Sequence, residues 1–175
     1  MKTVGIIGGL GPETTSKFYL EVIFGCQKIN TDSRPSILIQ SVPIAYLLER
    51  EEILEGICRK ETLQMLIGAA DNLVKGGADF IVMPCNSLHV FIDELRKATE
   101  VPIMSIIEIV VKFLVERKIS RIGLLSTLVT RKSKLYEIPL MKNGIICELP
   151  EDSEQEKINE IILNLINGSH GAEEH

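Results

Sequence analysis

The sequence of 175 residues contains no Trp, and aromatic residues make up only 5% of it. Proteins that bind single-stranded nucleic acid stack bases on aromatic side chains, so this scarcity argues against that class. Basic residues are also fewer than acidic ones, 19 against 24, which leaves a net charge of −5. A negative chain repels a phosphate backbone or an anionic membrane surface. We therefore expect neither nucleic acid nor a membrane as a partner.

Long hydrophobic runs are missing as well. Every apolar stretch is interrupted well before the roughly 20 residues that a membrane-spanning helix needs, and Met1 and Lys2 lead directly into Val4–Ile7 without a signal-like region. We expect a cytoplasmic protein. The four cysteines are spaced singly, with no Cys-x-x-Cys pair and no His at zinc-ligand spacing, so the sequence predicts neither a disulfide framework nor a metal site.

The sequence does contain a regular alternation of short β-branched runs and longer amphipathic segments. Up to residue 98 it predicts strands at 3–8, 36–41 and 79–84, and helices over 13–29, over 44–76 with a break near Gly56, and over 88–98. From Pro102 onward it predicts strands at 102–105, 121–126 and 145–149, and helices over 108–117, 130–142 and 154–167. Ser153 and Glu156 are expected to form a capping box for the last helix, which Gly168 ends.

These strands are apolar along their length, which predicts burial on both faces of a parallel sheet that lies between layers of helices. The fold class is therefore α/β, with residues 1–100 as a first domain and residues 101–175 as a partial second one. Ligands of such sheets bind beyond the carboxyl ends of the strands. The loops expected there are Gly8–Thr15, Ser41–Pro43, Pro84–His89 and Ser126–Ser133.

The first loop, Gly8–Thr15, is rich in glycine and leads into a helix. Its backbone N–H groups suit an anion such as a phosphate or a carboxylate. A dinucleotide matches less well, because a third glycine is missing and the second strand ends in Gln40 and Ser41 where an acid would hold a ribose. A tight strand-to-helix turn without a ligand explains the glycines equally well.

Cys85 lies at the carboxyl end of the third strand, just before a predicted helix. A helix dipole lowers the pKa of a thiol at its N-terminus, so a working thiolate suits this place. Most cysteines are small buried hydrophobes, and Cys26 and Cys58, both predicted on helices, keep that interpretation. Three polar neighbours in the ligand loop favour a functional thiol at Cys85: Asn86, Ser87 and His89.

The segment Ser126–Tyr136 also follows a strand and begins a helix. Its hydroxyl and N–H groups are suitable for a carboxylate. Taken alone, the segment is better explained by capping of the helix by Thr130.

Together the three segments resemble the aspartate/glutamate racemase family. The matching motifs are Gly8-Gly9-x-Gly11-Pro12-x-Thr14-Thr15, Pro84-Cys85-Asn86-Ser87-x-His89 and Leu125-x-Thr127-x-x-Thr130-x-x-Ser133-x-x-Tyr136. The resemblance covers nearly the whole chain. It implies two similar Rossmann-like halves around a cleft, no pyridoxal phosphate or other cofactor, and an acidic amino acid as substrate. It also implies one cysteine on each side of the substrate α-carbon, with Cys85 as the first.

Two thiols are needed because inversion through a carbanion requires a base on one face of the α-carbon and an acid on the other. In the family the second cysteine lies in a Gly-Cys-Thr-Glu-Leu-Pro segment, and we expect this chain to end before that position. Residues 147–150 are similar only superficially, since Gly and Thr are missing, so Cys147 is interpreted as a packed strand residue. A truncated second half would expose a sheet edge and helix faces, which favours a homodimer.

The resemblance makes Cys85 the catalytic base and gives the surrounding loops the substrate carboxylate. Arg50 is a candidate for a bidentate contact to a distal carboxylate, although an Arg in such a charged segment is more often solvated. His89 is expected to orient Cys85 or a substrate group, or else to cap or pack locally. The predicted substrate-binding residues are Gly11, Thr15, Arg50, Asn86, Ser87, Thr127 and Thr130.

Two other functions stay open from the sequence. One is a catalytically inactive family member that only binds carboxylates. The other is a nucleotide-binding α/β protein, which the glycine loop alone motivates.

Overall fold

The structure is a computed structural model that describes residues 2–166, and these residues form two compact units. Unit 1 comprises residues 2–44 and 59–109, and unit 2 comprises residues 45–58 and 110–166. The chain therefore leaves unit 1 after Ile44, returns to it at Arg59 and leaves it again after Ile109. The division expected from the sequence instead places residues 45–58 in the first domain and residues 101–109 in the second.

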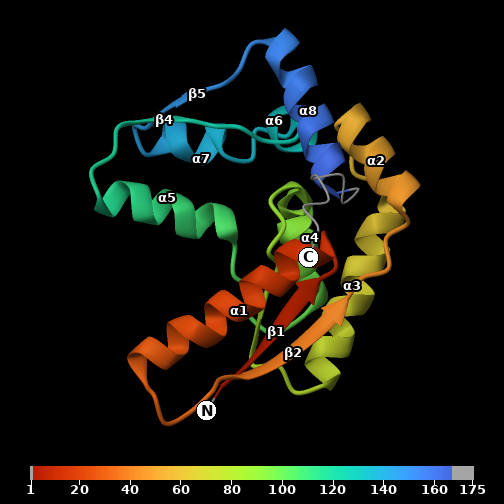
Figure 1. Ribbon diagram of the computed structural model, residues 1–175, viewed down its shortest axis with the longest axis vertical. Helices are drawn as coiled ribbons and strands as arrows, with labels where there is room; N and C mark the ends of the chain where they lie inside the picture. The colour runs from red at the N-terminus through yellow and green to blue at the C-terminus, as the bar shows by residue number, and fades with distance from the viewer. Residues whose placement is uncertain (1, 167–175) are drawn as a thin grey trace, which may run out of the picture. The chain divides into compact units, whose positions relative to one another are not determined.

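Unit 1 is built on a parallel sheet with the strand order β2-β1-β3 (Figure 1). The strands span Thr3–Gly8 (β1), Ser36–Ser41 (β2) and Phe80–Val82 (β3). The central strand β1 is buried from Val4 onward, whereas the residues of β2 are half-buried or exposed. Burial on both faces, which the sequence predicts for every strand, is therefore wrong for β2, because an edge strand has fewer neighbours to cover it.

Helices α1 (Pro12–Ile29) and α3 (Lys60–Lys75) lie on either side of this sheet (Figure 1). Helix α3 buries one apolar stripe, which includes Leu66, Ala69 and Leu73, and it contacts β1 and β2. It ends at Gly76 and Gly77, and Gly77 has the left-handed φ of 89° that the sequence predicts for a cap. In α1, by contrast, Thr15 is the one buried residue.

Two predicted elements of unit 1 differ from the structure. Residues 102–105 form no strand of their own, and Ile103 makes a single bridge to Ile81 of β3. Pro102 has no N–H to donate, and helix α5 (Ile106–Glu116) begins at once, so the segment is too short to pair further. The helix predicted over 88–98 is divided into a 3₁₀ turn, η1 (Ser87–Phe91), and the α-helix α4 (Ile92–Ala98).

Unit 2 contains a two-stranded parallel sheet of β4 (Arg121–Gly123) and β5 (Ile146–Glu148). Its further helices are α2 (Tyr46–Glu55), α6 (Leu128–Lys132), α7 (Glu137–Lys142) and α8 (Asp152–Ile166). Helix α7 packs against β5, and α2 lies against α6 and α8 (Figure 1). Both strands are half-buried at their middle residue and exposed at their ends, so the expected two-sided burial is wrong here too.

The helix predicted over 130–142 is broken into α6 and α7. The break occurs because Lys134 takes a left-handed φ of 51° and Leu135 donates its N–H to the Thr130 carbonyl over 3.3 Å, which closes α6. The last helix starts at Asp152, two residues after Pro150, so Glu151 and Glu154 take the place of the predicted capping pair. The Glu154 carboxylate accepts the Glu151 N–H over 2.9 Å. The predicted end at Gly168 lies outside the described residues.

The α/β class with parallel sheets and flanking helices is thus confirmed. Among residues 2–166, no helix is both long enough and apolar enough to cross a membrane.

Candidate active site

The glycine turn after β1 is closed by the side chain of Thr15. The Thr15 Oγ1 accepts the Gly9 N–H over 2.9 Å and donates to the Gly11 carbonyl over 3.0 Å. Gly9 has a φ of 87°, and a Cβ there would lie 2.7 Å from the Ser41 hydroxyl, so no other residue fits. The donor of the buried Thr15 hydroxyl is therefore already used within the turn. A direct contact from Thr15 or Gly11 to substrate stays a prediction.

Cys85 lies in the segment that follows β3. Because Ile6 pairs with Val82 in parallel register, the ends of β1 and β3 are adjacent, and the glycine turn and the Cys85 segment leave the same edge of the sheet. Cys85 is half-buried, between the buried Pro84 and the exposed Asn86. The residue is thus partly exposed to solvent.

The helix start after Cys85 is shorter than expected. Asn86 is the residue before the 3₁₀ turn η1, which contains Ser87, and α4 begins only at Ile92. The sequence suggests a continuous α-helix directly after Cys85. Because the described chain has a 3₁₀ turn there and a seven-residue α-helix only later, fewer peptide dipoles align behind Cys85 than expected. Contacts from Asn86 and Ser87 to substrate stay predictions.

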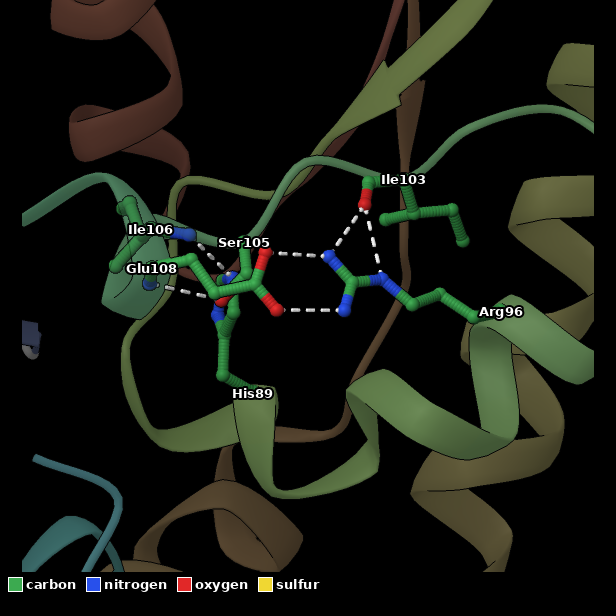
Figure 2. A network of polar contacts seen from close by, with 6 residues as sticks. All are labelled: His89, Arg96, Ile103, Ser105, Ile106 and Glu108. Atoms are coloured by element: carbon green, nitrogen blue, oxygen red, sulfur yellow. Dashed lines mark hydrogen bonds and ion pairs between the residues drawn. The ribbon is translucent and has the colours of Figure 1, made fainter. Parts of the chain in front are cut away.

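His89 fixes the backbone of the Cys85 segment. The residue is 1% exposed, and its Nδ1 lies 2.7 Å from the Cys85 carbonyl oxygen. Its Nε2 accepts the Ile106 N–H over 3.1 Å (Figure 2). This pattern requires a neutral ring that carries its proton on Nδ1. Burial lowers the pKa of His89, against the smaller opposing effect of the hydrogen bond to Cys85. His89 thus contacts the backbone of Cys85, and an orienting role for the thiol or a substrate group stays a prediction.

A second network joins α4 to the start of α5 (Figure 2). The Arg96 guanidinium binds the Glu108 carboxylate with two bonds of 2.7 and 2.9 Å and the Ile103 carbonyl with two of 3.1 and 3.0 Å. The Glu108 N–H points to the Ser105 hydroxyl at 3.4 Å. The hydrogen bond from Arg96 lowers the pKa of the Glu108 carboxyl. Together with His89, this network holds residues 103–108 against η1 and α4.

The threonine turn of unit 2 begins α6. Thr127 is the N-cap: its Oγ1 accepts the Thr130 N–H over 3.3 Å and lies 3.3 Å from the Thr130 hydroxyl. The expectation that Thr130 caps this helix is therefore wrong, because the helix starts two residues earlier than predicted. Thr130 is fully buried beneath the turn. Contacts from either threonine to a carboxylate stay predictions.

Arg50 is exposed on α2 and so belongs to the same unit as the threonine turn. Its pairing with a distal carboxylate stays a prediction. Cys147 is a half-buried residue of β5, and burial, followed by the nearby Glu137 carboxylate, raises the pKa of its thiol. Cys58 lies in the connection between α2 and α3, so its predicted helical position is wrong.

The four cysteines all lie within the described residues, and none forms a disulfide. Over residues 2–166, no three His, Cys, Asp or Glu side chains cluster in a way that would hold a metal ion.

Sequence reasoning missed the side chains that fasten these loops. Arg96 and Glu108 were not singled out, because charges 12 residues apart in a chain show no local pattern. Gln155 and Asn159 of α8 were also missed, although polar residues four apart on a predicted amphipathic helix were a usable signal. Both amides bond to the threonine turn or to each other.

Known proteins resemble this chain over almost its full length. The family model for Asp/Glu/Hydantoin racemase matches residues 7–174. The broad specificity amino-acid racemase RacX of Bacillus subtilis (strain 168) is 32% identical over 171 residues, which are 95% of this chain and 72% of RacX.

Solved structures agree. A crystal structure of an aspartate racemase homologue from Pyrococcus horikoshii OT3 is 28% identical with a TM-score of 0.72, and the match covers 93% of this chain and 70% of that one. The Picrophilus torridus aspartate racemase shares the fold with a TM-score of 0.71 at 24% identity, over 96% of this chain and 76% of its own. With the three motif loops at the carboxyl ends of parallel strands and a family match over residues 7–174, this chain belongs to the Asp/Glu/Hydantoin racemase family of amino-acid racemases.

Proposed function

We propose that this chain acts on an acidic amino acid, aspartate or glutamate, and that Cys85 is the base that removes its α-proton. The observation that carries the proposal is the position of the half-buried Cys85 on the loop beside the glycine turn, with its backbone held by the buried His89. All four cysteines are half-buried, so Cys85 is distinguished by its place beyond the carboxyl end of a parallel strand, where ligands of such sheets bind.

In the proposed step the Cys85 thiolate takes the proton from the substrate α-carbon and becomes a thiol. The electron pair of the broken C–H bond stays on the α-carbon and is delocalised into the carboxylate. Return of a proton to the same face restores the substrate, and delivery to the opposite face inverts it. Inversion therefore requires a second acid, which the family resemblance gives to a second cysteine.

Backbone N–H groups and hydroxyls would stabilise the charge that develops on the substrate carboxylate. In unit 1 the candidates are the turn at Gly11 and Thr15 and the start of η1 at Asn86 and Ser87. In unit 2 they are Thr127 and Thr130, with Arg50 for the distal carboxylate. Support for this part comes from the N-cap geometry of Thr127, whose Oγ1 accepts the Thr130 N–H and so fixes the side chain at the start of α6.

The substrate class is the finer part of the proposal. The name of the Bacillus subtilis relative specifies broad specificity, whereas the Pyrococcus and Picrophilus structures are named for aspartate. An assay for this chain should therefore include L-aspartate and L-glutamate with L-alanine as a neutral comparison.

The test is exchange of the α-hydrogen in heavy water, followed by proton NMR, with chiral chromatography of the product. We expect loss of the α-proton signal of aspartate or glutamate with the wild-type chain, and none with Cys85→Ser. The matched control is Cys147→Ser, which removes a half-buried strand thiol and should leave exchange unchanged. Failure of all candidate acids to exchange would contradict catalysis by this chain.

The same assay separates catalysis from binding alone. Deuteration with inversion supports a racemase, and deuteration without inversion indicates that Cys85 works on one face only. Binding of aspartate or glutamate without any deuteration identifies a carboxylate-binding protein. Binding of NAD or ATP in preference to the amino acids would contradict the proposal altogether.

We also propose a homodimer, because α1 exposes Leu20, Phe24 and Ile29. Light scattering on the purified chain tests this state, and a monomer at all concentrations would contradict it.

A further inference from the structure

Helix α8 turns amide side chains inward. Its buried residues are Gln155 (3% exposed), Asn159 (6% exposed) and Leu163, while Ile161 and Leu165 of the same helix are exposed. An amphipathic helix normally buries its apolar residues and exposes its polar ones. Burial of an amide costs free energy unless its hydrogen bonds are made, so the partners of these two side chains explain their position.

Those partners lie in the threonine turn. The Gln155 Nε2 donates to the Ser126 carbonyl over 2.8 Å and to the Asn159 Oδ1 over 3.0 Å. The same Asn159 Oδ1 accepts the Leu128 N–H over 3.2 Å. Both N–H bonds of the Gln155 amide are thus used. Gln155 and Asn159 together form a clamp that bonds to the backbone at the Ser126 carbonyl and at the Leu128 N–H.

The two backbone contacts fall immediately before and after Thr127. Because the Ser126 carbonyl and the Leu128 N–H are both held by α8, the peptide groups on either side of Thr127 cannot rotate independently. The Thr127 side chain is then directed toward the Thr130 N–H and hydroxyl. The clamp therefore sets both the backbone and the side-chain direction of this residue.

We infer that Gln155 and Asn159 are positioning residues for the carboxylate-binding turn at Thr127, and that they act on the affinity for an acidic amino acid without touching it. This inference rests on the proposed function, in which Thr127 and Thr130 bind the carboxylate. An apolar stripe on α8 would avoid the desolvation of two amides but would leave the Ser126 carbonyl and the Leu128 N–H without these partners.

The test compares Asn159→Leu with Asn164→Leu in the full chain. Both make the same substitution on α8, but Asn164 is exposed and serves as the matched control. Titration calorimetry with L-aspartate and L-glutamate gives the Kd, and amide hydrogen exchange by NMR reports on the Leu128 N–H. Asn159→Asp keeps the Oδ1 acceptor for the Leu128 N–H. Gln155→Met removes the Gln155 donor with a side chain of similar size, and this variant repeats the affinity test if Asn159→Leu does not fold.

We expect Asn159→Leu or Gln155→Met to raise the Kd about tenfold, with no change for Asn164→Leu. The Leu128 amide should lose its protection in Asn159→Leu and keep it in Asn159→Asp. An unchanged Kd in a folded Asn159→Leu whose Leu128 amide is unprotected would overturn the inference while leaving the proposed function intact. A wild-type chain that binds neither amino acid would overturn both, and this result is visible before any variant is made.

Discussion

The Cys85 segment of unit 1 and the Thr127 segment of unit 2 are each held from the side by buried polar side chains, but the chemistry of the two clamps differs. In unit 1 the imidazole of His89 bridges the Cys85 carbonyl and the Ile106 N–H. In unit 2 the amides of Gln155 and Asn159 bridge the Ser126 carbonyl and the Leu128 N–H. An imidazole titrates near neutral pH and an amide does not. The first clamp should therefore depend on pH and the second should not.

The sheets of the two units differ in how deeply their strands are buried. The central strand β1 has a neighbour on each side and is buried from Val4 to its last residue, Gly8. In unit 2 the two strands β4 and β5 are each an edge, and only their middle residues are half-buried. Unit 1 thus depends on one buried strand, and unit 2 depends on its helices.

Truncation of the buried strand should have the largest effect on stability. Ile6 is fully buried in β1, so Ile6→Ala should lower the free energy of unfolding by about 3 kcal/mol through lost burial and a cavity. Ile122→Ala in the half-buried β4 should lower it by about 1 kcal/mol. Urea unfolding followed by circular dichroism measures both, and equal losses would contradict the difference between the two sheets.

Removal of the His89 imidazole should have the second-largest effect on stability. His89→Leu leaves the Ile106 N–H without its acceptor and the Cys85 carbonyl without its donor. An unsatisfied group at a buried position costs about 1–3 kcal/mol, so we expect a loss of about 2 kcal/mol. His89→Gln, which retains a donor and an acceptor, is the comparison and should lose less. Two variants with the same unfolding midpoint would show that the bonds contribute little.

The pH-dependent change in stability that the imidazole clamp causes, and the amide clamp does not, should be smaller than either of these losses. Burial lowers the pKa of His89 below its usual 6.5, so on acidification the unfolded chain takes up a proton before the folded chain does. Stability should therefore fall as the pH decreases below 6.5, until the lowered pKa of the folded state is reached.

Urea midpoints from about pH 8 to about pH 5 measure this slope in the wild type and in His89→Gln. The nearby Arg96 and Glu108 keep their charges over that range, since the hydrogen bond between them lowers the pKa of Glu108. The slope should be shallower in His89→Gln, and the double variant with Asn159→Leu should show the same slope as His89→Gln alone. An identical slope in wild type and His89→Gln would exclude His89 as its source.

The smallest expected effect concerns left-handed backbone. Among the described residues, those with positive φ in unit 1 are the glycines Gly9 and Gly77, whereas unit 2 also uses Lys118 and Lys134, with φ of 56° and 51°. Lys118→Gly and Lys134→Gly should each stabilise the chain by about 0.5 kcal/mol, since relief of the Cβ clash exceeds the entropy that glycine adds to the unfolded state. A decrease in the thermal midpoint of both variants would contradict this.

The elements that the sequence predicted well are those with strong local signals. The bounds of β1 and β2 agree with the prediction, and α1 begins one residue earlier, at Pro12. The weak points were short elements whose limits depend on partners. The 102–105 segment lost its strand because one bridge to Ile81 is all that its position allows, and the helix over 130–142 was divided by the left-handed Lys134.

The candidate site shows the same division. Local sequence identified the glycine turn, Cys85 and the threonine turn, because their residue types are unusual at the ends of strands. Apart from His89, it did not identify the residues that hold nearby backbone, since Arg96, Gln155 and Asn159 act on groups 7 to 31 residues away in the chain. Such pairings leave no periodic pattern in the sequence.

The sequence alone determined the α/β alternation, the three loops and the family, because hydrophobic period and motif spacing are local properties of the chain. Only the tertiary structure decided that Thr15 closes the glycine turn, that His89 holds Cys85 by its carbonyl, and which side of α8 is buried. The reason is that hydrogen bonds between distant residues form where packing brings a donor to an acceptor, and packing is a property of the whole fold.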